Sequence, residues 1–155
     1  MSWLKTVLLC LTLTACGFEP VYGPGGTGTQ LQNRVAVDPP VDREGFLLVQ
    51  RLEERLGRPG DPAYGLAVEL NVGLEARAID PDGDLRRFHL IGSATYKLTD
   101  AATGAVLRSD EVDNFVSYSA TGTNVATVAA QRDATERLMT ILADEIVLHL
   151  QTTDL

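Results

Sequence analysis

Cysteine and histidine are scarce in this sequence, which has two of each among its 155 residues. A structural zinc site takes about four Cys or His ligands at close spacing, and neither His89 nor His149 has such a neighbour. No serine stands in a Gly-x-Ser-x-Gly elbow, and the glycine-rich residues 23–28 lack the Lys and Ser/Thr of a phosphate-binding loop. The sequence therefore predicts no metal site, no cofactor and no catalytic residue, and we expect that it is not an enzyme.

Three aspartates at alternate positions, Asp80, Asp82 and Asp84, are the nearest approach to a cation site. A calcium-binding EF-hand loop also needs glycine at its sixth position and glutamate at its twelfth, where this chain has Leu85 and Ile91. Asp, Pro and Gly are the residues that a tight turn favours. We therefore interpret residues 80–84 as a turn.

Basic residues are also few, since 13 Lys and Arg stand against 21 Asp and Glu, for a net charge of −8. Nonspecific nucleic-acid binding needs Lys and Arg clustered on one face. A polybasic attachment to anionic lipid has the same requirement. The composition argues against both, so any membrane attachment must come from another feature.

No apolar run in the sequence approaches the roughly 20 residues that span a bilayer. The apolar run at residues 7–13 is short, follows Lys5 and ends in small residues at 14–15. This order of charge, apolar run and small residues is typical of a secretory signal peptide. We predict a signal peptide over residues 1–15.

The four residues Leu13-Thr14-Ala15-Cys16 resemble a bacterial lipobox. The resemblance implies a diacylglyceryl group on the Cys16 thiol, removal of the leader, and acylation of the new amine. Two or more acyl chains hold a protein stably on a membrane, whereas one does so only marginally. Gly17, a non-acidic residue after the cysteine, implies export to the outer membrane. The alternatives are a secreted protein cut after Ala15 and a Cys10–Cys16 disulfide, which cleavage would remove.

Residues 16–33 are rich in Gly, Pro and Thr, and we predict that they form a flexible tether behind the lipidated cysteine. Residues 34–155 form one domain, long enough to bury a core without metal or disulfides. Within it, a helix is predicted over 42–57. Asp42 is suited to cap this helix, and Val41 and Phe46 have the spacing of a hydrophobic staple. Its apolar residues recur at helical spacing: Phe46, Val49, Leu52 and Leu56.

Four stretches outside this helix have strand patterns. Apolar and polar residues alternate over 66–78 and again over 88–98, with the apolar residues at even numbers in both. Residues 34–38 form a shorter candidate strand. A third long strand is predicted over 105–121, where poorer alternation indicates a bulge.

The shared parity of 66–78 and 88–98 restricts how these strands pair. The residue numbers of two facing residues must add up to an even number, because a shift of the pairing by one residue turns every side chain to the other face. A loop at 81–85 would place Leu70 opposite Tyr96 and Glu69 opposite Lys97, which pairs apolar with apolar and acid with base.

The chain ends in a predicted helix over 124–150. Its apolar residues share one face: Ala130, Ala134, Leu138, Ile141, Leu142, Ile146 and Leu150. The order strand, helix, three strands, helix predicts an α+β fold, a two-layer sandwich with both helices on one face of a four-stranded sheet.

Two segments, "CGFEPVYG" at 16–23 and "VSYSATGTNVATVAAQRDATERLMTILADEIVLHL" at 116–150, resemble the lipopolysaccharide-assembly lipoproteins of the LptE family in their alphaproteobacterial form. The resemblance extends over nearly the whole chain after the leader, including its order of strands and helices. It implies a non-catalytic subunit on the periplasmic side of the outer membrane. Such a protein plugs the LptD β-barrel, helps it assemble, and supports transport of lipopolysaccharide to the outer leaflet. A wide barrel has a polar lumen, which suits the polar, solvent-exposed strand faces predicted above.

Lipopolysaccharide is anionic, so a direct contact would use basic residues. The candidates around the three long strands are Arg86, Arg87, Lys97 and Arg108. The alternative is that they are ordinary solvated charges on strand faces.

A lipid carrier is the alternative function, with an acyl chain held between sheet and helices. It predicts an apolar pocket of several hundred Å³ lined by residues such as Leu70, Tyr96 and Leu142, where a plug would have a filled core.

Overall fold

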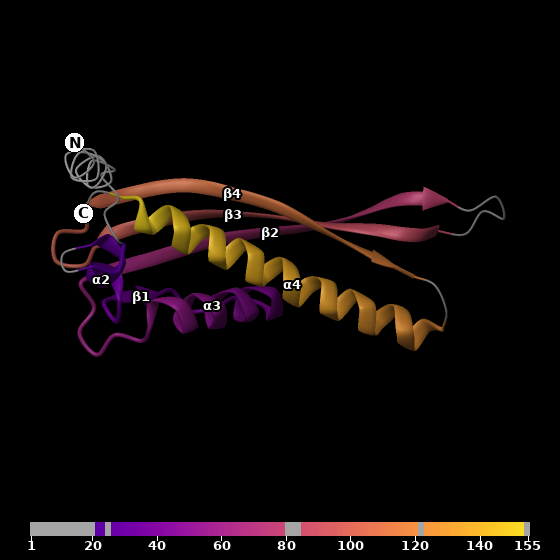
Figure 1. Cartoon of the computed structure of the whole chain (residues 1–155), viewed down its shortest axis with the longest axis horizontal. Helices are drawn as coiled ribbons and strands as arrows, with labels where there is room; N and C mark the ends of the chain where they lie inside the picture. The colour runs from indigo at the N-terminus through magenta and orange to yellow at the C-terminus, as the bar shows by residue number, and fades with distance from the viewer. Residues whose placement is uncertain (1–20, 24–25, 80–84, 121–122, 154–155) are drawn as a thin grey trace, which may run out of the picture.

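The computed structural model describes residues 21–23, 26–79, 85–120 and 123–153 (Figure 1). The predicted signal peptide, Cys16 and the turn at 80–84 lie outside these ranges. The described residues form a four-stranded sheet in the order β1-β2-β3-β4. Its strands are β1 (Val35–Val37), β2 (Tyr64–Ile79), β3 (Leu85–Asp100) and β4 (Val106–Ser119). β1 pairs parallel to β2, and the other two pairings are antiparallel.

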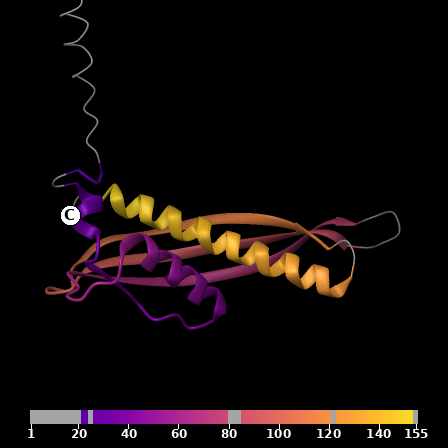
Figure 2. The same ribbon diagram turned by 60° about the horizontal axis from the view of Figure 1, so that its bottom comes forward.

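Two helices cover one face of the sheet, α3 (Arg43–Leu56) and the much longer α4 (Asn124–Gln151). Figures 1 and 2 show them side by side in one layer with the sheet behind them. This arrangement confirms the α+β class, with both helices on one side of a four-stranded sheet.

A short helix, α2 (Thr27–Leu31), comes before β1 where the sequence predicted only tether. Leu31 is fully buried in the core, and Gly28 is buried as well. A Cβ on Gly28 would lie 2.8 Å from Val21 Cγ1, so glycine permits the close approach of these two segments. The expected tether over 16–33 therefore needs correction, because a single apolar anchor at Leu31 holds its last part on the domain.

α3 begins and ends where the sequence predicted and buries Leu52 and Leu56 as predicted, but Leu48 is buried in place of Phe46. Asp42 caps it by accepting a hydrogen bond from the Gly45 amide at 2.7 Å. The predicted staple is wrong, since Val41 is 100% exposed and Phe46 is 57% exposed. The buried residues are Leu48, Leu52 and Leu56. The helix carries two overlapping apolar stripes, and its packing against α4 and the sheet selects the second.

The pairing of β2 with β3 keeps the predicted faces but differs in register. Val68 lies opposite Tyr96, and Leu70 lies opposite Ala94, which is two residues away from the prediction. A shift by two leaves the same side chains on the same face. The outermost pair is Ile79 with Leu85, whereas a loop at 81–85 would have paired residues 80 and 86, and the irregularity near Ala78 leaves this register unchanged.

β4 contains the predicted bulge. Leu98 pairs with Arg108 and Thr99 pairs with Val106, so Leu107 is the extra residue. The turn that leads into β4 has Gly104 at φ +72°, a left-handed conformation that favours glycine.

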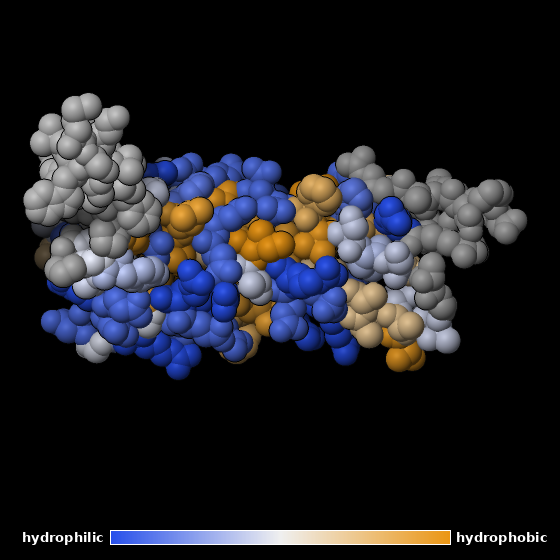
Figure 3. Space-filling view, in the orientation of Figure 1, coloured by the Kyte–Doolittle hydropathy of each residue, from blue (hydrophilic) through white to orange (hydrophobic). Residues whose placement is uncertain are grey.

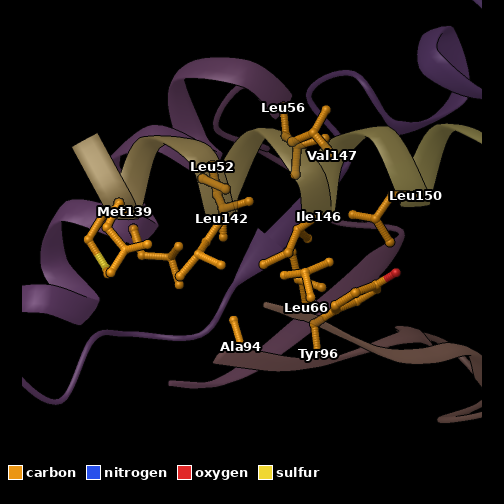
Figure 4. Close-up of a cluster of buried hydrophobic side chains, with 14 of the residues drawn as sticks. Leu52, Leu56, Leu66, Ala94, Tyr96, Met139, Leu142, Ile146, Val147 and Leu150 are labelled. Atoms are coloured by element: carbon orange, nitrogen blue, oxygen red, sulfur yellow. The ribbon is translucent and has the colours of Figure 1, made fainter. Parts of the chain in front are cut away.

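The core lies between the sheet and α4 (Figure 4). Five of the residues predicted for the apolar stripe of α4 are fully buried, namely Ala134, Leu138, Leu142, Ile146 and Leu150. Three further residues that the sequence analysis missed are buried too: Met139, Ala143 and Val147. α4 packs against both α3 and the sheet, so it buries a wider face than a helix with one neighbour.

Candidate interaction surfaces

The start and the end of the described chain meet at one end of the sheet. Gln151 Nε2 donates a hydrogen bond to the Tyr22 hydroxyl at 2.5 Å, and Thr27 Oγ1 donates to the Thr153 carbonyl at 3.4 Å. Val21, the first described residue at this end, comes five positions after Cys16 in the sequence. We call this the anchor end, and the lipidation of Cys16 stays a prediction because that residue is outside the described ranges.

A polar cluster lies under α4 near the anchor end. Arg108 Nη2 lies 2.7 Å from Asp110 Oδ2, and His149 Nδ1 lies 3.9 Å from the same oxygen. Tyr96 is 1% exposed, and its ring centroid is 6.4 Å from that of His149. The Tyr96 hydroxyl and His149 Nδ1 are buried without a hydrogen-bond partner in the described structure.

The charges of this cluster compensate one another. The hydrogen bond from Arg108 holds the pKa of Asp110 below its usual value, and burial raises the pKa of Tyr96. Arg108 therefore faces the helix layer and is already paired. Among the lipopolysaccharide-contact candidates whose side chains are described, it is the one whose charge is least available to an outside phosphate.

Arg87 and Lys97 are on the opposite face of β3, which we call the open face because no described helix covers it. Arg87 and Lys97 are both exposed there. They are ten positions apart on one strand, which corresponds to about 33 Å. The side chain of Arg86 is outside the described structure. The structure thus does not bring the four candidates together into one basic site.

An apolar patch that sequence reasoning missed lies at the middle of the open face. The rings of His89 and Phe115 stack at 5.0 Å with an interplanar angle of 15°, and Phe115 is 56% exposed. Ile91 is the cross-strand partner of both Phe115 and Gly73, and a Cβ on Gly73 would meet no atom within 4 Å. We call His89, Ile91 and Phe115 the open-face patch. The one feature of the sequence that indicates this patch is Phe115, an aromatic residue on the otherwise polar side of the strand predicted over 105–121.

The helix side of the molecule is mostly hydrophilic, with smaller hydrophobic patches (Figure 3). One patch lies at the N-terminal end of α4, where Val125 is 80% exposed and Val128 is also exposed. Leu148 is exposed near the other end of the helix.

The pocket expected for a lipid carrier is not formed around the residues named for it. Tyr96 is 1% exposed and Leu142 is fully buried, and both pack within the core (Figure 4). A cavity wide enough for an acyl chain would leave accessible surface on such side chains. Leu70 instead lines two pockets of about 340 and 330 Å³ that are open to solvent beside the start of α3.

Within the described part of the chain, no three His, Cys, Asp or Glu side chains are grouped closely enough to hold a metal ion. None of the described helices combines the length and the apolar character needed to cross a membrane.

The sequence model of the lipopolysaccharide-assembly family, LptE, matches residues 32–150. This range begins after α2 and contains all four strands, α3 and nearly all of α4. No curated protein matches the chain.

Solved structures of lipoproteins are similar to the whole domain. A crystal structure of a protein described as a lipoprotein, from Caulobacter crescentus, is 32% identical with a TM-score of 0.68, and the match covers 83% of this chain and 95% of that one. Rare lipoprotein B from Shewanella oneidensis is 14% identical with a TM-score of 0.58, over 77% and 92% of the two chains. A minor lipoprotein from Acinetobacter baumannii has the same identity and coverages with a TM-score of 0.57. The last two show the fold alone.

Proposed function

The chain belongs to the lipopolysaccharide-assembly family LptE, and from this membership we propose that it is an outer-membrane lipoprotein that plugs the LptD β-barrel. In this role it supports assembly of the barrel and passage of lipopolysaccharide to the outer leaflet. It acts by shape and contact, without catalysis. The observation that carries the proposal is the family match over the folded domain.

The packing of the domain supports a plug more than a carrier. The residues between the sheet and α4 are fully buried and leave no room for a lipid chain around Tyr96 and Leu142. The open face, in contrast, is wet, with Glu69, Thr95 and Ser117 exposed along three neighbouring strands. A domain that buries its own apolar core beneath a polar exterior suits the polar lumen of a wide barrel.

Membrane attachment in this proposal comes from acyl chains on Cys16. The Cys16→Ser variant should fold as the wild type does, because Cys16 precedes the packed residues, and should leave the membrane fraction. Membrane fractionation and mass spectrometry of the mature N-terminus measure the two effects. A Cys16→Ser protein that still sediments fully with the outer membrane would contradict the anchor.

The barrel partnership is tested by purifying the tagged protein from detergent-solubilised outer membrane. We expect a large LptD-type β-barrel in near-equal amount. The matched control is the Cys16→Ser variant, which should recover much less because it is released from the membrane. Recovery of soluble periplasmic proteins alone from the wild type would contradict the plug.

Direct contact with lipopolysaccharide is a second part of the proposal. Arg87 and Lys97 are the described candidates whose charges face solvent on the open face. Arg108 contributes less, because Asp110 already neutralises it.

A further inference from the structure

β4 forms one edge of the sheet, and in the described structure only β3 pairs with it. In Figure 1 it lies above β3 and β2 in the left part of the view and below them toward its arrowhead. The opposite edge, β1, has three residues, whereas β4 has 14. A long free edge exposes a row of backbone amides and carbonyls to which another strand can bind. β1 pairs only with Tyr64–Leu66 of β2, so the sheet has unpaired strand edge on both sides, and β4 is the edge that is free along its whole length in the described structure.

Two side-chain hydrogen bonds show which residues of β4 direct their backbone groups to the free side. The Glu111 amide donates to Asp110 Oδ1 and the Phe115 amide donates to Asn114 Oδ1, both at 2.9 Å. In an antiparallel strand, the backbone groups of successive residues point alternately toward the neighbour and away from it. The amides of the odd-numbered residues of β4 thus face away from β3.

Those side chains protect only part of the free edge. Among the odd-numbered residues, Asp113, Ser117 and Ser119 have amides that no described side chain caps. Residues 115–119, Phe-Val-Ser-Tyr-Ser, contain neither a charge nor a proline, the two features with which proteins commonly block an exposed edge. This part of β4 is therefore open to pairing.

The other half of β4 is acidic. Glu111 and Asp113 are exposed and form no ion pair with a described residue, unlike Asp110, which pairs with Arg108. A strand bound along β4 would bring its own side chains within about 5 Å of these carboxylates. Lys or Arg in the bound strand beside Glu111 and Asp113 would neutralise these two carboxylates.

We propose that an extended segment of the barrel partner pairs with residues 111–119 of β4 as a fifth strand and places Lys or Arg beside Glu111 and Asp113. An apolar side chain of this segment lies next to Phe115 and extends the open-face patch. This inference rests on the proposed function, since it specifies where the barrel meets the plug.

The charge pattern favours a foreign segment over a second copy of this chain. In an antiparallel pair centred on Ser117, Asp113 would lie opposite Thr121, and in one centred on Phe115 it would lie opposite Ser117. Neither register supplies a basic residue to Asp113. A self-pair would therefore leave the acidic half of β4 without counter-charges.

The test replaces Ser117, whose amide faces the free edge. Ser117→Pro removes that amide and leaves the hydrogen bonds to β3, because proline is tolerated on the outer side of an edge strand. Ser117→Ala is the matched control, since it removes only the hydroxyl. We expect both variants to keep the melting temperature of the wild type within a few degrees. We expect recovery of the barrel from detergent-solubilised outer membrane to fall at least about tenfold for Ser117→Pro alone.

Amide hydrogen exchange in the wild type gives a second measurement that needs no variant. The amides of Ser117 and Ser119 should exchange at least about tenfold more slowly in the purified complex with the barrel than in the free protein. Those of the buried neighbours Val116 and Tyr118, already bonded to β3, should change far less.

The outcomes separate the two proposals. If the wild type recovers the barrel, but Ser117→Pro recovers as much and the exchange at 117 and 119 is unchanged, edge pairing is wrong and the plug proposal stands. If the wild type recovers no barrel, both proposals fail. If the free protein dimerises with the same two amides protected, a second copy occupies the edge and the inference is overturned.

Discussion

Gly92 of β3 lies directly beneath α4, where a Cβ atom on it would come within 3.0 Å of Leu142 Cδ1 and 3.1 Å of Leu138 Cδ2. The missing side chain lets the long helix approach the sheet. Valine at this position must displace two fully buried leucines, and overpacking of this kind costs about 1–3 kcal/mol. Gly92→Val should therefore lower the free energy of unfolding by about that amount, measured by urea denaturation.

The matched control for that prediction is Gly73→Val, on the neighbouring strand. A Cβ on Gly73 meets nothing within 4 Å, and valine favours strands. Gly73→Val should therefore leave the stability unchanged or raise it slightly. Equal losses in the two variants would show that contact with α4 is not what requires glycine at 92.

The side of α4 that is buried against the sheet gives a second prediction. Leu138 is fully buried, while Leu148 on the same helix is 59% exposed. Leu138→Asp buries an unpaired carboxylate and should abolish cooperative unfolding. Leu148→Asp should change the melting temperature by only a few degrees, because its charge stays in water. Circular dichroism during heating distinguishes the two, and a cooperative transition near the wild-type temperature for Leu138→Asp would contradict the packing.

The turn between β3 and β4 gives a pH prediction. Asp100 Oδ1 accepts hydrogen bonds from the Thr103 hydroxyl at 2.8 Å and the Thr103 amide at 2.7 Å, which hold the pKa of Asp100 below its ordinary value of 3.8. A carboxyl with a lowered pKa stabilises the fold above its ordinary value, and the contribution is lost as the pH falls through the folded pKa. Thr103→Ala should raise the pKa of Asp100 toward 3.8 and reduce this acid dependence. NMR titration of the carboxyl carbon measures it, with Thr95→Ala as a control that leaves the pKa unchanged.

The basic residues of the open face give a prediction about lipopolysaccharide. Arg87→Ala and Lys97→Ala should each weaken binding to immobilised lipopolysaccharide about two- to fivefold, since each removes one exposed charge. Arg137→Ala is the control on the helix side, where Arg137 pairs with Asp133 at 3.0 Å. Equal losses in all three variants would indicate a general charge effect and contradict a contact on the open face.

The sequence predicts a helix or strand of this fold well where only one of its faces packs against the rest of the protein. β2 and β3 each have one face toward the core and one toward solvent. The alternation of apolar and polar residues therefore identifies both strands and the side of each that is buried. α3 shows the opposite case. Phe46 and Leu48 both belong to plausible helical stripes, and only the position of α4 decides that Leu48 is buried and Phe46 exposed. The β2–β3 register likewise depends on where the paired strands end, since their outermost pair is Ile79 with Leu85 and the alternation pattern does not determine that position.

The interaction surfaces were less predictable. Basic residues can be found in a sequence, but whether a given one faces solvent or a carboxylate depends on pairing across the fold. Arg108 and Lys97 are both in strands, yet Arg108 lies under α4 beside Asp110, while Lys97 is exposed on the other face. The open-face patch joins His89 and Phe115 from different strands, so no local pattern indicates it.

α4 spans 28 residues, which makes it about 42 Å long. Its last turn is held to Tyr22 at the anchor end, and its first residue lies at the far end of the molecule (Figure 2). With the proposed lipid on Cys16, the length of α4 limits how far from the bilayer surface the far end of the domain can lie. Removing one helical turn from α4, with the matching length of the strands beneath it, would then bring Val125 and Val128 closer to the anchor end by about 5 Å.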